Sequence, residues 1–393
     1  MQKPVDYFHR IGRLPPYVFS EVNNLKLKLR REGTDIIDLG MGNPDSPTPE
    51  HIVKKLIETC QNPNVHGYSS SRGIKGLRKA SSDYYKRRFN VDICPEKEAI
   101  VTIGSKEGLA SLAKATTKLG DTVLVPDPCY PIHTFGFVIV DANVVHISST
   151  NKDNFFEKLE ETFNNCSPKP VALILNYPCN PTAEVVDLEF YEQAVDFCRF
   201  HGMYIWSDLA YCEIYFNDKP PPSVLQVKGA KDIAVEFISM SKTYSMAGWR
   251  VGMAVGNETL IAALTKIKSY LDYGIYTPIQ VAAAEALNAS QQCVIDNRAM
   301  YKDRRDTLIG GLNRAGWKVE SPDASMFCWA KIPEKFAEMG SLEFSKMLMH
   351  KSGVAISPRI GFGKNGDKFV RISMVENKQR IRQATKNIKL AFA

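Results

Sequence analysis

The residues best suited to chemistry surround one lysine in the second half of the chain. An apolar run at 235–239 ends in Ser239, and Lys242 and Arg250 follow within eleven residues. A lysine at the end of a buried strand can lose its water, which lowers its pKa and lets the neutral amine attack a carbonyl to form an imine. A serine and an arginine nearby could hold a phosphate, since arginine binds phosphate with two parallel hydrogen bonds. An ordinary surface lysine before a turn is the alternative, but the surrounding Ser, Gly and Arg pattern favours the reactive lysine.

A carboxylate ends a second apolar run. Asp208 follows the strand-like stretch 203–207, and a charge at such a place is costly unless it is paired. A protonated pyridine nitrogen is a suitable partner, because the carboxylate keeps the ring protonated and able to accept electrons from a substrate carbanion. A helix N-cap at a strand–helix junction would explain the same residue equally well.

Three further loops could contact a cofactor. Ser105 and Lys106 open a predicted helix, where free N–H groups and the helix dipole favour phosphate, although the GxxxxGK spacing of a Walker loop is missing. Tyr130 lies in a proline-stiffened loop, where it could stack on an aromatic ring or serve only as a packing residue. Asn180 lies in an Asn-Pro stretch, which on its own is more typical of a plain turn.

These residues must be positioned by alternating strands and helices. Apolar, strand-like stretches separated by helical ones predict a mainly parallel sheet covered by helices, an α/β fold. In such sheets ligands bind beyond the carboxyl ends of the strands, and most of the residues above lie at such an end. The predicted strands are 99–103, 122–125, 142–147, 171–175, 203–207 and 235–239, with helices at 105–118 and 187–201.

The rest of the chain predicts a second, smaller unit. A largely helical stretch at 276–312 is expected to bridge two domains, and 326–330 and 369–373 are expected to be strands of a smaller α+β layer. Single cores stop growing at roughly 250–300 residues, so a chain of 393 residues should divide. We expect an N-terminal arm and part of the small domain at 1–47, a large domain at 48–290, and a C-terminal small domain at 291–393.

The composition is that of a globular protein, with 44% hydrophobic and 24% charged residues. The net charge of +7 is mild and its basic residues are scattered, so no nucleic-acid partner is expected. Nine dispersed cysteines, without a CxxC pair or a histidine cluster, predict reduced thiols, no metal site and a cytoplasmic protein. No apolar run approaches the roughly 20 residues needed to span a bilayer, and no signal-peptide pattern is present, so no membrane partner is expected.

Taken together, the order and spacing of these motifs resemble the class I aminotransferases of fold type I, from 38–44 to 369–371. The resemblance implies a pyridoxal-phosphate-dependent aminotransferase that works as a homodimer on amino acids and 2-oxo acids. It also implies roles for individual residues. Lys242 forms the imine, Asp208 pairs with the pyridine nitrogen, Tyr211 and Asn180 bind the ring hydroxyl, Tyr130 stacks on the ring, and Ser105, Lys106, Ser239 and Arg250 hold the phosphate. Tyr68 reaches the phosphate of the neighbouring subunit, Gly42, Tyr17 and Asn180 lie beside the substrate, and Arg371 clamps its α-carboxylate.

Within that family the chain resembles the bacterial glutamate–pyruvate (alanine) aminotransferases in the stretches 13–19, 66–69, 101–108 and 268–274. The implied reaction converts L-alanine and 2-oxoglutarate to pyruvate and L-glutamate, which serves alanine biosynthesis. The LL-diaminopimelate aminotransferases share the cofactor residues and remain the alternative.

One position departs from the family pattern. Arg359 stands where a glycine is expected, and it could alter side-chain preference if its loop borders the substrate. Arg359 and Arg72 are the candidates for binding the distal carboxylate of glutamate.

Three other classes of function compete with a transaminase. A carbon–sulfur lyase would share Lys242 and differ in what the carbanion expels. A small-molecule sensor fused to a DNA-binding module would need an N-terminal helix-turn-helix, yet the aminotransferase pattern starts within the first forty residues. A nicotinamide dehydrogenase would need GxGxxG after an early strand, which the stretch 40–44 does not provide.

Overall fold

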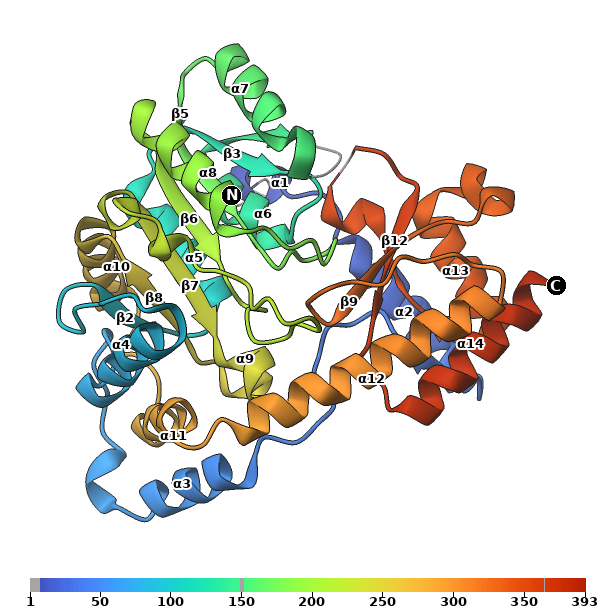
Figure 1. Ribbon diagram of the computed structural model, residues 1–393, viewed down its shortest axis with the longest axis horizontal. Coiled ribbons are helices and arrows are strands. Elements are labelled where there is room, and N and C mark those ends of the chain that lie inside the picture. The colour runs from blue at the N-terminus through green and yellow to red at the C-terminus, as the bar shows by residue number, and fades with distance from the viewer. Residues whose placement is uncertain (1–7, 149–151, 364) are drawn as a thin grey trace, which may run out of the picture.

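A seven-stranded sheet forms the centre of the larger part of the molecule (Figure 1). The computed structural model describes residues 8–148, 152–363 and 365–393, so the first seven residues of the predicted N-terminal arm lie outside the described part. The strand order is β2-β8-β7-β6-β5-β3-β4. The strands are β2 (Ala99–Thr102), β3 (Thr122–Pro126), β4 (Asn143–Ile147), β5 (Pro170–Leu175), β6 (Tyr204–Asp208), β7 (Ala234–Ser239) and β8 (Gly252–Gly256).

The direction of the strands brings the predicted chemical residues to one edge. Strands β4, β3, β5, β6 and β7 are parallel neighbours, whereas β8 runs antiparallel to both β7 and β2. Six strands therefore end at the same edge, and β8, which the sequence analysis did not predict, begins there. The mainly parallel sheet predicted from the sequence is confirmed.

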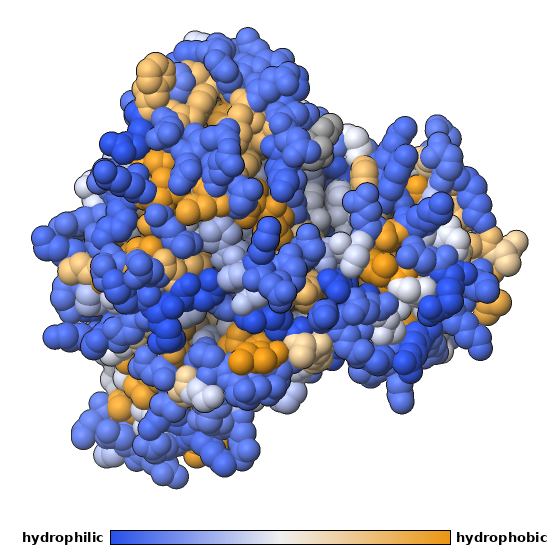
Figure 2. Space-filling model, in the orientation of Figure 1, coloured by the Kyte–Doolittle hydropathy of each residue, from blue (hydrophilic) through white to orange (hydrophobic). Residues whose placement is uncertain are grey.

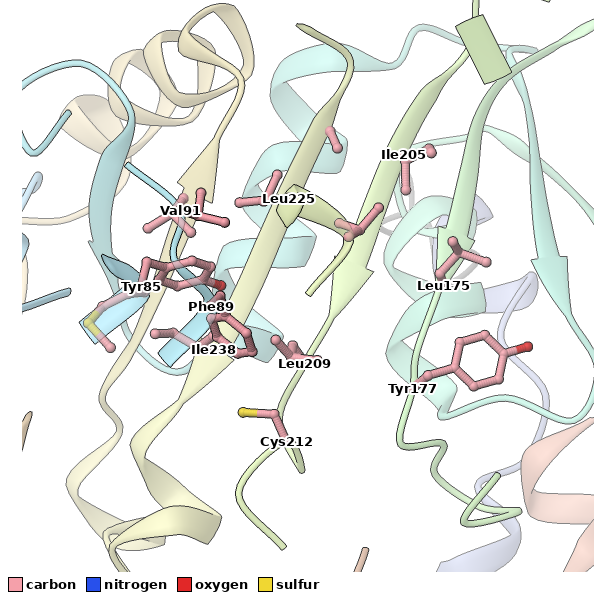
Figure 3. Close-up of a cluster of buried hydrophobic side chains, with 14 of the residues drawn as sticks. Tyr85, Phe89, Val91, Leu175, Tyr177, Ile205, Leu209, Cys212, Leu225 and Ile238 are labelled. Atoms are coloured by element: carbon pink, nitrogen blue, oxygen red, sulfur yellow. The ribbon is translucent and has the colours of Figure 1, made fainter. Parts of the chain in front are cut away.

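The central strands are buried on both faces, which explains why their sequences are almost wholly apolar. Because side chains alternate along a strand, Leu173 and Leu175 of β5 join one hydrophobic cluster while Ala172 and Ile174 join another on the opposite face. Figure 3 shows part of the first cluster: Ile238 of β7 lies beside Tyr85 and Phe89 of α4, and Leu175 of β5 lies near Tyr177.

Helices cover both faces of this sheet. The helices α5, α6 and α10 supply apolar residues to one cluster, and α4, α7, α8 and α11 supply the other. Their bounds are α3 (Glu50–Cys60), α4 (Lys75–Phe89), α5 (Ser105–Thr116), α6 (Pro131–Val138), α7 (Phe155–Asn165), α8 (Leu188–Phe200), α9 (Met240–Thr243), α10 (Glu258–Leu271) and α11 (Thr277–Asn288).

A smaller unit at the right of Figure 1 has its own core. Its antiparallel sheet has the order β11-β12-β9, and a short parallel pair joins β1 to β10. Leu39, near the start of the chain, packs in the same cluster as residues of α12, α13 and α14, so both ends of the chain contribute to this core. The elements are α2 (Val18–Arg31), β1 (Ile37–Asp38), α12 (Gln292–Arg314), β9 (Phe327–Lys331), α13 (Gly340–Ser352), β10 (Val354–Ala355), β11 (Ser357–Pro358), β12 (Phe369–Ser373) and α14 (Lys378–Phe392). The short helix α1 (His9–Gly12) lies against the larger unit instead, where Arg10 pairs with Asp141.

The helical stretch predicted at 276–312 consists of two helices, α11 and α12, and the long α12 runs from beside α9 to the smaller unit (Figure 1). The smaller α+β layer is confirmed. The domain boundaries after residues 47 and 290 stay a prediction.

The face of the molecule in Figure 2 is mostly hydrophilic, with separate hydrophobic patches. Among the described residues, no helix is long and apolar enough to cross a membrane. The same residues hold no group of three or more His, Cys, Asp or Glu side chains arranged for a metal ion.

Candidate active site

A cavity of about 760 Å³ opens at the carboxyl edge of the large sheet, where the smaller unit meets it. This volume suits a cofactor-sized ligand with a small substrate. Its wall comes from both units and from the segments that follow β2, β3, β5, β6 and β7. The cavity brings together these site residues predicted from the sequence: Tyr17, Gly42, Ser105, Lys106, Tyr130, Asn180, Asp208, Tyr211, Ser239, Lys242, Arg250 and Arg371.

Lys242 lies on the short helix α9, directly after β7. Its Nζ donates a hydrogen bond of 2.5 Å to the backbone oxygen of Gly42. Burial, together with the positive charges of Arg371 and Arg250, lowers the pKa of Lys242 to about 8. A large fraction of this amine is therefore neutral and nucleophilic near pH 8, as the sequence analysis expected for a desolvated lysine.

Asp208 is the last residue of β6 and is nearly fully buried. Its Oδ2 lies 3.0 Å from Nε2 of His133, and its backbone oxygen accepts a hydrogen bond of 2.7 Å from Nδ2 of Asn176. Its Oδ1 is buried and has no hydrogen-bond partner among the described residues. A turn, not a helix, follows Asp208, so the N-cap alternative is wrong.

The sequence analysis missed two of these neighbours as site residues. His133 lies one turn after Tyr130 on α6 and is fully buried. In the sequence, only its spacing from Tyr130 could have identified His133 as a site residue. Asn176 lies four residues before Asn180, and its Oδ1 accepts a hydrogen bond from the backbone N–H of Asn180 at 2.9 Å. Both residues hold predicted site residues in place.

Groups suited to binding an anion gather around the N-terminus of α5. Ser105 is the first residue of that helix, as predicted, and Gly104 before it adopts a positive φ of 77°. A Cβ at Gly104 would overlap the guanidinium of Arg250, so only glycine lets this arginine lie against the helix start. Ser239 and Lys106 also line the cavity. Free helix N–H groups together with these side chains form a suitable anion site.

Arg371, on β12, is a buried cation. Its Nη1 donates to Oδ1 of Asn180 at 2.7 Å, and its Nη2 donates to the backbone oxygen of Gly40 at 2.8 Å. Its guanidinium carbon lies 4.1 Å from the ring centre of Phe327. Among the described residues no carboxylate lies within ion-pair distance of it, and burial lowers its pKa to about 10. An unpaired cation in such a place is costly, so it suits an anionic ligand.

Asn180 joins this arginine to Tyr211. Its Nδ2 lies 3.4 Å from the hydroxyl of Tyr211, whose ring packs edge-on against Phe327 at 5.5 Å. Burial raises the pKa of Tyr211, which keeps its phenol protonated and able to donate a hydrogen bond. Asn180 and Tyr211 therefore connect the arginine side of the cavity to the side that carries Asp208.

Three other residues named from the sequence lie outside the cavity. Tyr68 is 88% exposed and stacks against Tyr273 with ring centres 4.5 Å apart. Arg359 is buried and paired with Asp127, and Arg72 donates to the backbone oxygens of residues 96 and 99. The expectation that Arg359 or Arg72 binds a distal carboxylate within this chain's own cavity is wrong, because neither lines it.

Comparison with known proteins agrees with this geometry. The family model described as aminotransferase class I and II matches residues 34–388. The chain is 57% identical to AatC of Rhizobium meliloti (strain 1021), covering 98% of this chain and 95% of the relative. It is 54% identical to the glutamate-pyruvate aminotransferase AlaC of Escherichia coli (strain K12), covering 99% and 95%. An LL-diaminopimelate aminotransferase of Aquifex aeolicus (strain VF5) is 40% identical, covering 98% of each.

Solved structures show the same fold. The substrate-bound structure of BacF from Bacillus subtilis matches with a TM-score of 0.92 and 35% identity, covering 98% of both chains. A mutant aspartate aminotransferase of Thermus thermophilus matches with a TM-score of 0.91 and 27% identity, covering 98% of this chain and all of the other. The resemblance inferred from the motifs is confirmed, and the chain belongs to the class I and II aminotransferase family.

Proposed function

We propose that this aminotransferase exchanges the amino group between L-alanine and 2-oxoglutarate, giving pyruvate and L-glutamate, with pyridoxal phosphate held at Lys242. The observation that carries the proposal is the pair formed by Lys242 and Arg371 in one cavity, a desolvated amine and a buried cation without a carboxylate partner among the described residues. The higher identity to AlaC than to the LL-diaminopimelate enzyme of Aquifex aeolicus supports alanine as the donor.

The residues present fit pyridoxal phosphate. The buried Oδ1 of Asp208, which has no hydrogen-bond partner among the described residues, would accept a hydrogen bond from a protonated ring nitrogen. Ser105, Lys106, Ser239 and Arg250 provide the phosphate donors at the start of α5. When bound, this cofactor supplies an aldehyde carbon that links reversibly to amines and a ring that accepts electrons.

The residues of the chain have separate roles in the reaction. Arg371 binds the α-carboxylate of the substrate through its planar fork, which orients the bond to the α-proton. The Lys242 amine, whose pKa of about 8 keeps it partly neutral, takes the α-proton and later returns it. The His133 contact at Oδ2 of Asp208 fixes the direction of the other carboxylate oxygen, which would face the ring nitrogen. Asn180 and Tyr211, which lie next to each other, would bind the hydroxyl group of the cofactor ring.

We also propose that the working unit is a homodimer. Tyr68 packs against Tyr273, and both rings are exposed, so this surface would gain from being covered by a second copy. Each Tyr68 would then complete the phosphate site of the partner. Mixing inactive Lys242→Ala subunits with inactive Tyr68→Phe subunits should restore activity, whereas a fully active monomer in light scattering would contradict the proposal.

We place the enzyme in the cytoplasm. All nine cysteines are free thiols in the structure, six of them buried. Free thiols persist in reducing compartments. Fractionation of cells that produce the protein tests this placement, and recovery in a secreted fraction would contradict it.

The test of the substrate compares donors with the purified holoenzyme. Alanine and LL-diaminopimelate are each offered with 2-oxoglutarate, and kcat/KM is measured for both. The proposal expects the larger value for alanine. A much larger value for diaminopimelate would move the assignment to that substrate, and release of pyruvate and a thiol from cystathionine would indicate a carbon–sulfur lyase.

A further inference from the structure

A buried ion pair joins two loops that both reach the cavity. Nη2 of Arg359 lies 2.9 Å from Oδ1 of Asp127, and the two residues are only 4% and 5% exposed. The backbone N–H of Asn365 donates to the other oxygen of Asp127 at 3.3 Å. Asp127 follows β3 of the large sheet, whereas Arg359 begins the short 3-10 helix η7 (Arg359–Phe362) of the smaller unit. The pair therefore connects the two units.

Each partner lies three residues before a side chain of the cavity wall. Asp127 precedes Tyr130, and Arg359 precedes Phe362. The backbone N–H of Cys129 also donates to the backbone oxygen of Phe362 at 2.9 Å, so the two loops are joined a second time. A shift of one loop would have to break both connections.

Phe362 forms an aromatic wall beside the buried arginine. Its ring centre lies 4.7 Å from the guanidinium carbon of Arg371 and 5.1 Å from the ring centre of Phe19. Phe19 also lines the cavity. When the α-carboxylate of a substrate binds Arg371, the substrate's side chain therefore starts close to the ring of Phe362.

The backbone on both sides of Phe362 is tightly packed against neighbouring side chains. Gly363 adopts a positive φ of 147°, and a Cβ there would overlap the carboxylate of Asp127. A Cβ at Gly361 would overlap the ring of Phe19. The segment thus has one packed position, and the ion pair lies at its beginning.

The charges of this pair are not available to a substrate. Arg359 does not line the cavity, and its charge is balanced by Asp127. A buried ion pair contributes little to net stability, because desolvation offsets the attraction, but it can select one arrangement over others. The role that remains for the pair of Asp127 and Arg359 is to position Phe362.

We propose that Asp127 and Arg359 are positioning residues that hold Phe362 against Arg371 and thereby exclude amino donors with bulky aromatic side chains. The proposal rests on the proposed transamination of alanine. A wall that cannot retreat accepts the methyl group of alanine and excludes a bulky aromatic donor such as phenylalanine.

The test uses the neutral double variant Asp127→Asn/Arg359→Gln, which removes both charges without leaving one buried alone. Alanine and phenylalanine are compared as donors with 2-oxoglutarate in the holoenzyme. The ratio of kcat/KM for alanine to that for phenylalanine should fall about tenfold, a change typical of a reshaped pocket. The loss for alanine should appear mainly in KM. A matched control is Asp35→Asn/Arg380→Gln, which removes an exposed pair away from the cavity and should leave the ratio unchanged.

A second readout does not depend on turnover. Propionate and 3-phenylpropionate, carboxylates without an amine, are titrated into each holoenzyme by calorimetry. The preference between them should shift toward 3-phenylpropionate in the double variant and stay fixed in the control. If the double variant does not fold, Arg359→Lys keeps the charge, loses the planar fork, and should give a smaller shift in the same direction.

The results separate the possible failures. Equal losses for both donors with an unchanged carboxylate preference, accompanied only by a lower melting temperature, would overturn the positioning role. A wild-type enzyme that ignores alanine would contradict the proposed function, while the carboxylate titration would still decide whether the pair positions the wall.

Discussion

Two buried carboxylates on neighbouring strands show how this molecule separates structural from chemical residues. Asp208 ends β6, and Glu236 lies inside β7 opposite Ser207. One oxygen of Asp208 faces His133, while the other has no hydrogen-bond partner among the described residues. Glu236 accepts four hydrogen bonds from within the fold, donated by Tyr85, Ser207, Ser223 and the backbone of Val224.

The difference indicates where a ligand belongs. Buried polar groups in folded proteins are almost always hydrogen-bonded, so an unsatisfied one calls for an explanation. Glu236 is complete without a ligand, and its partners join α4 and the segment after residue 222 to the sheet. Asp208 and Arg371 each have a buried polar atom without a hydrogen-bond partner among the described residues, and both line the cavity. Of these two carboxylates, the one with an unsatisfied oxygen therefore belongs to the site, and the satisfied one belongs to the framework.

The largest effect should follow from Asp208→Asn. The change removes the charge that stabilises a protonated ring, and this interaction strengthens as electrons move into the ring, so kcat should fall about 10²–10³-fold. The melting temperature should hardly change, because the free oxygen supports nothing in the fold. Steady-state kinetics and thermal unfolding check both parts, with the exposed Asp196→Asn as the control. Near-normal turnover would refute the role of Asp208.

Arg371→Lys should have the next largest effect. A lysine keeps the charge but cannot form two parallel hydrogen bonds, and the loss of one charge-assisted hydrogen bond costs about 1.5–3 kcal/mol. We expect kcat/KM to fall about 10–100-fold for alanine and glutamate alike, since both share the α-carboxylate. Arg380→Lys, at an exposed pair, serves as the control. A loss confined to one substrate would contradict the assignment.

Glu236→Gln should show the opposite pattern to Asp208→Asn. An amide nitrogen cannot accept the hydrogen bonds that one carboxylate oxygen receives, so the free energy of unfolding should fall by about 1–3 kcal/mol. The folded enzyme should keep its kcat and KM. Denaturant unfolding and kinetics on the same preparation check this contrast. A large loss of kcat without a loss of stability would break the distinction between the two carboxylates.

The smallest effect concerns pH. The neutral Lys242 amine must attack the cofactor aldehyde, so the rate at which the apoenzyme takes up pyridoxal phosphate should rise with pH around a midpoint near 8. Arg371 disfavours the nearby ammonium form, so removing its charge in Arg371→Met should raise the pKa and move the midpoint to higher pH. Stopped-flow absorbance measures the midpoint, and Arg380→Met is the control. A midpoint that moves down would contradict this electrostatic account.

Much of this arrangement could be predicted from the sequence because its strands are buried on both faces. Runs such as 171–175 are almost wholly apolar, and the helices between them set the direction of the sheet. Strand β8 was not predicted because it begins and ends in glycine, a residue that is uncommon in strands. Residues at or shortly after the end of a strand, such as Asp208 and Lys242, could be placed at one edge from the topology alone.

Contacts between distant segments could not be predicted in this way. The partner of Arg359 is Asp127, 232 residues earlier, and only packing of the two units brings them together. His133 likewise has no motif of its own, and its position opposite Asp208 depends on how α6 lies against β6. Such pairs depend on the shape of the whole core rather than on local periodicity.

The most direct test of the account is the site of cofactor attachment. The purified holoenzyme is reduced with borohydride, digested, and the labelled peptide is sequenced by mass spectrometry. The account predicts a yellow protein with the pyridoxyl label on Lys242, and no label and no transamination in Lys242→Ala, while the surface variant Lys114→Ala behaves as the wild type. Recovery of the label on any other lysine would contradict the central claim.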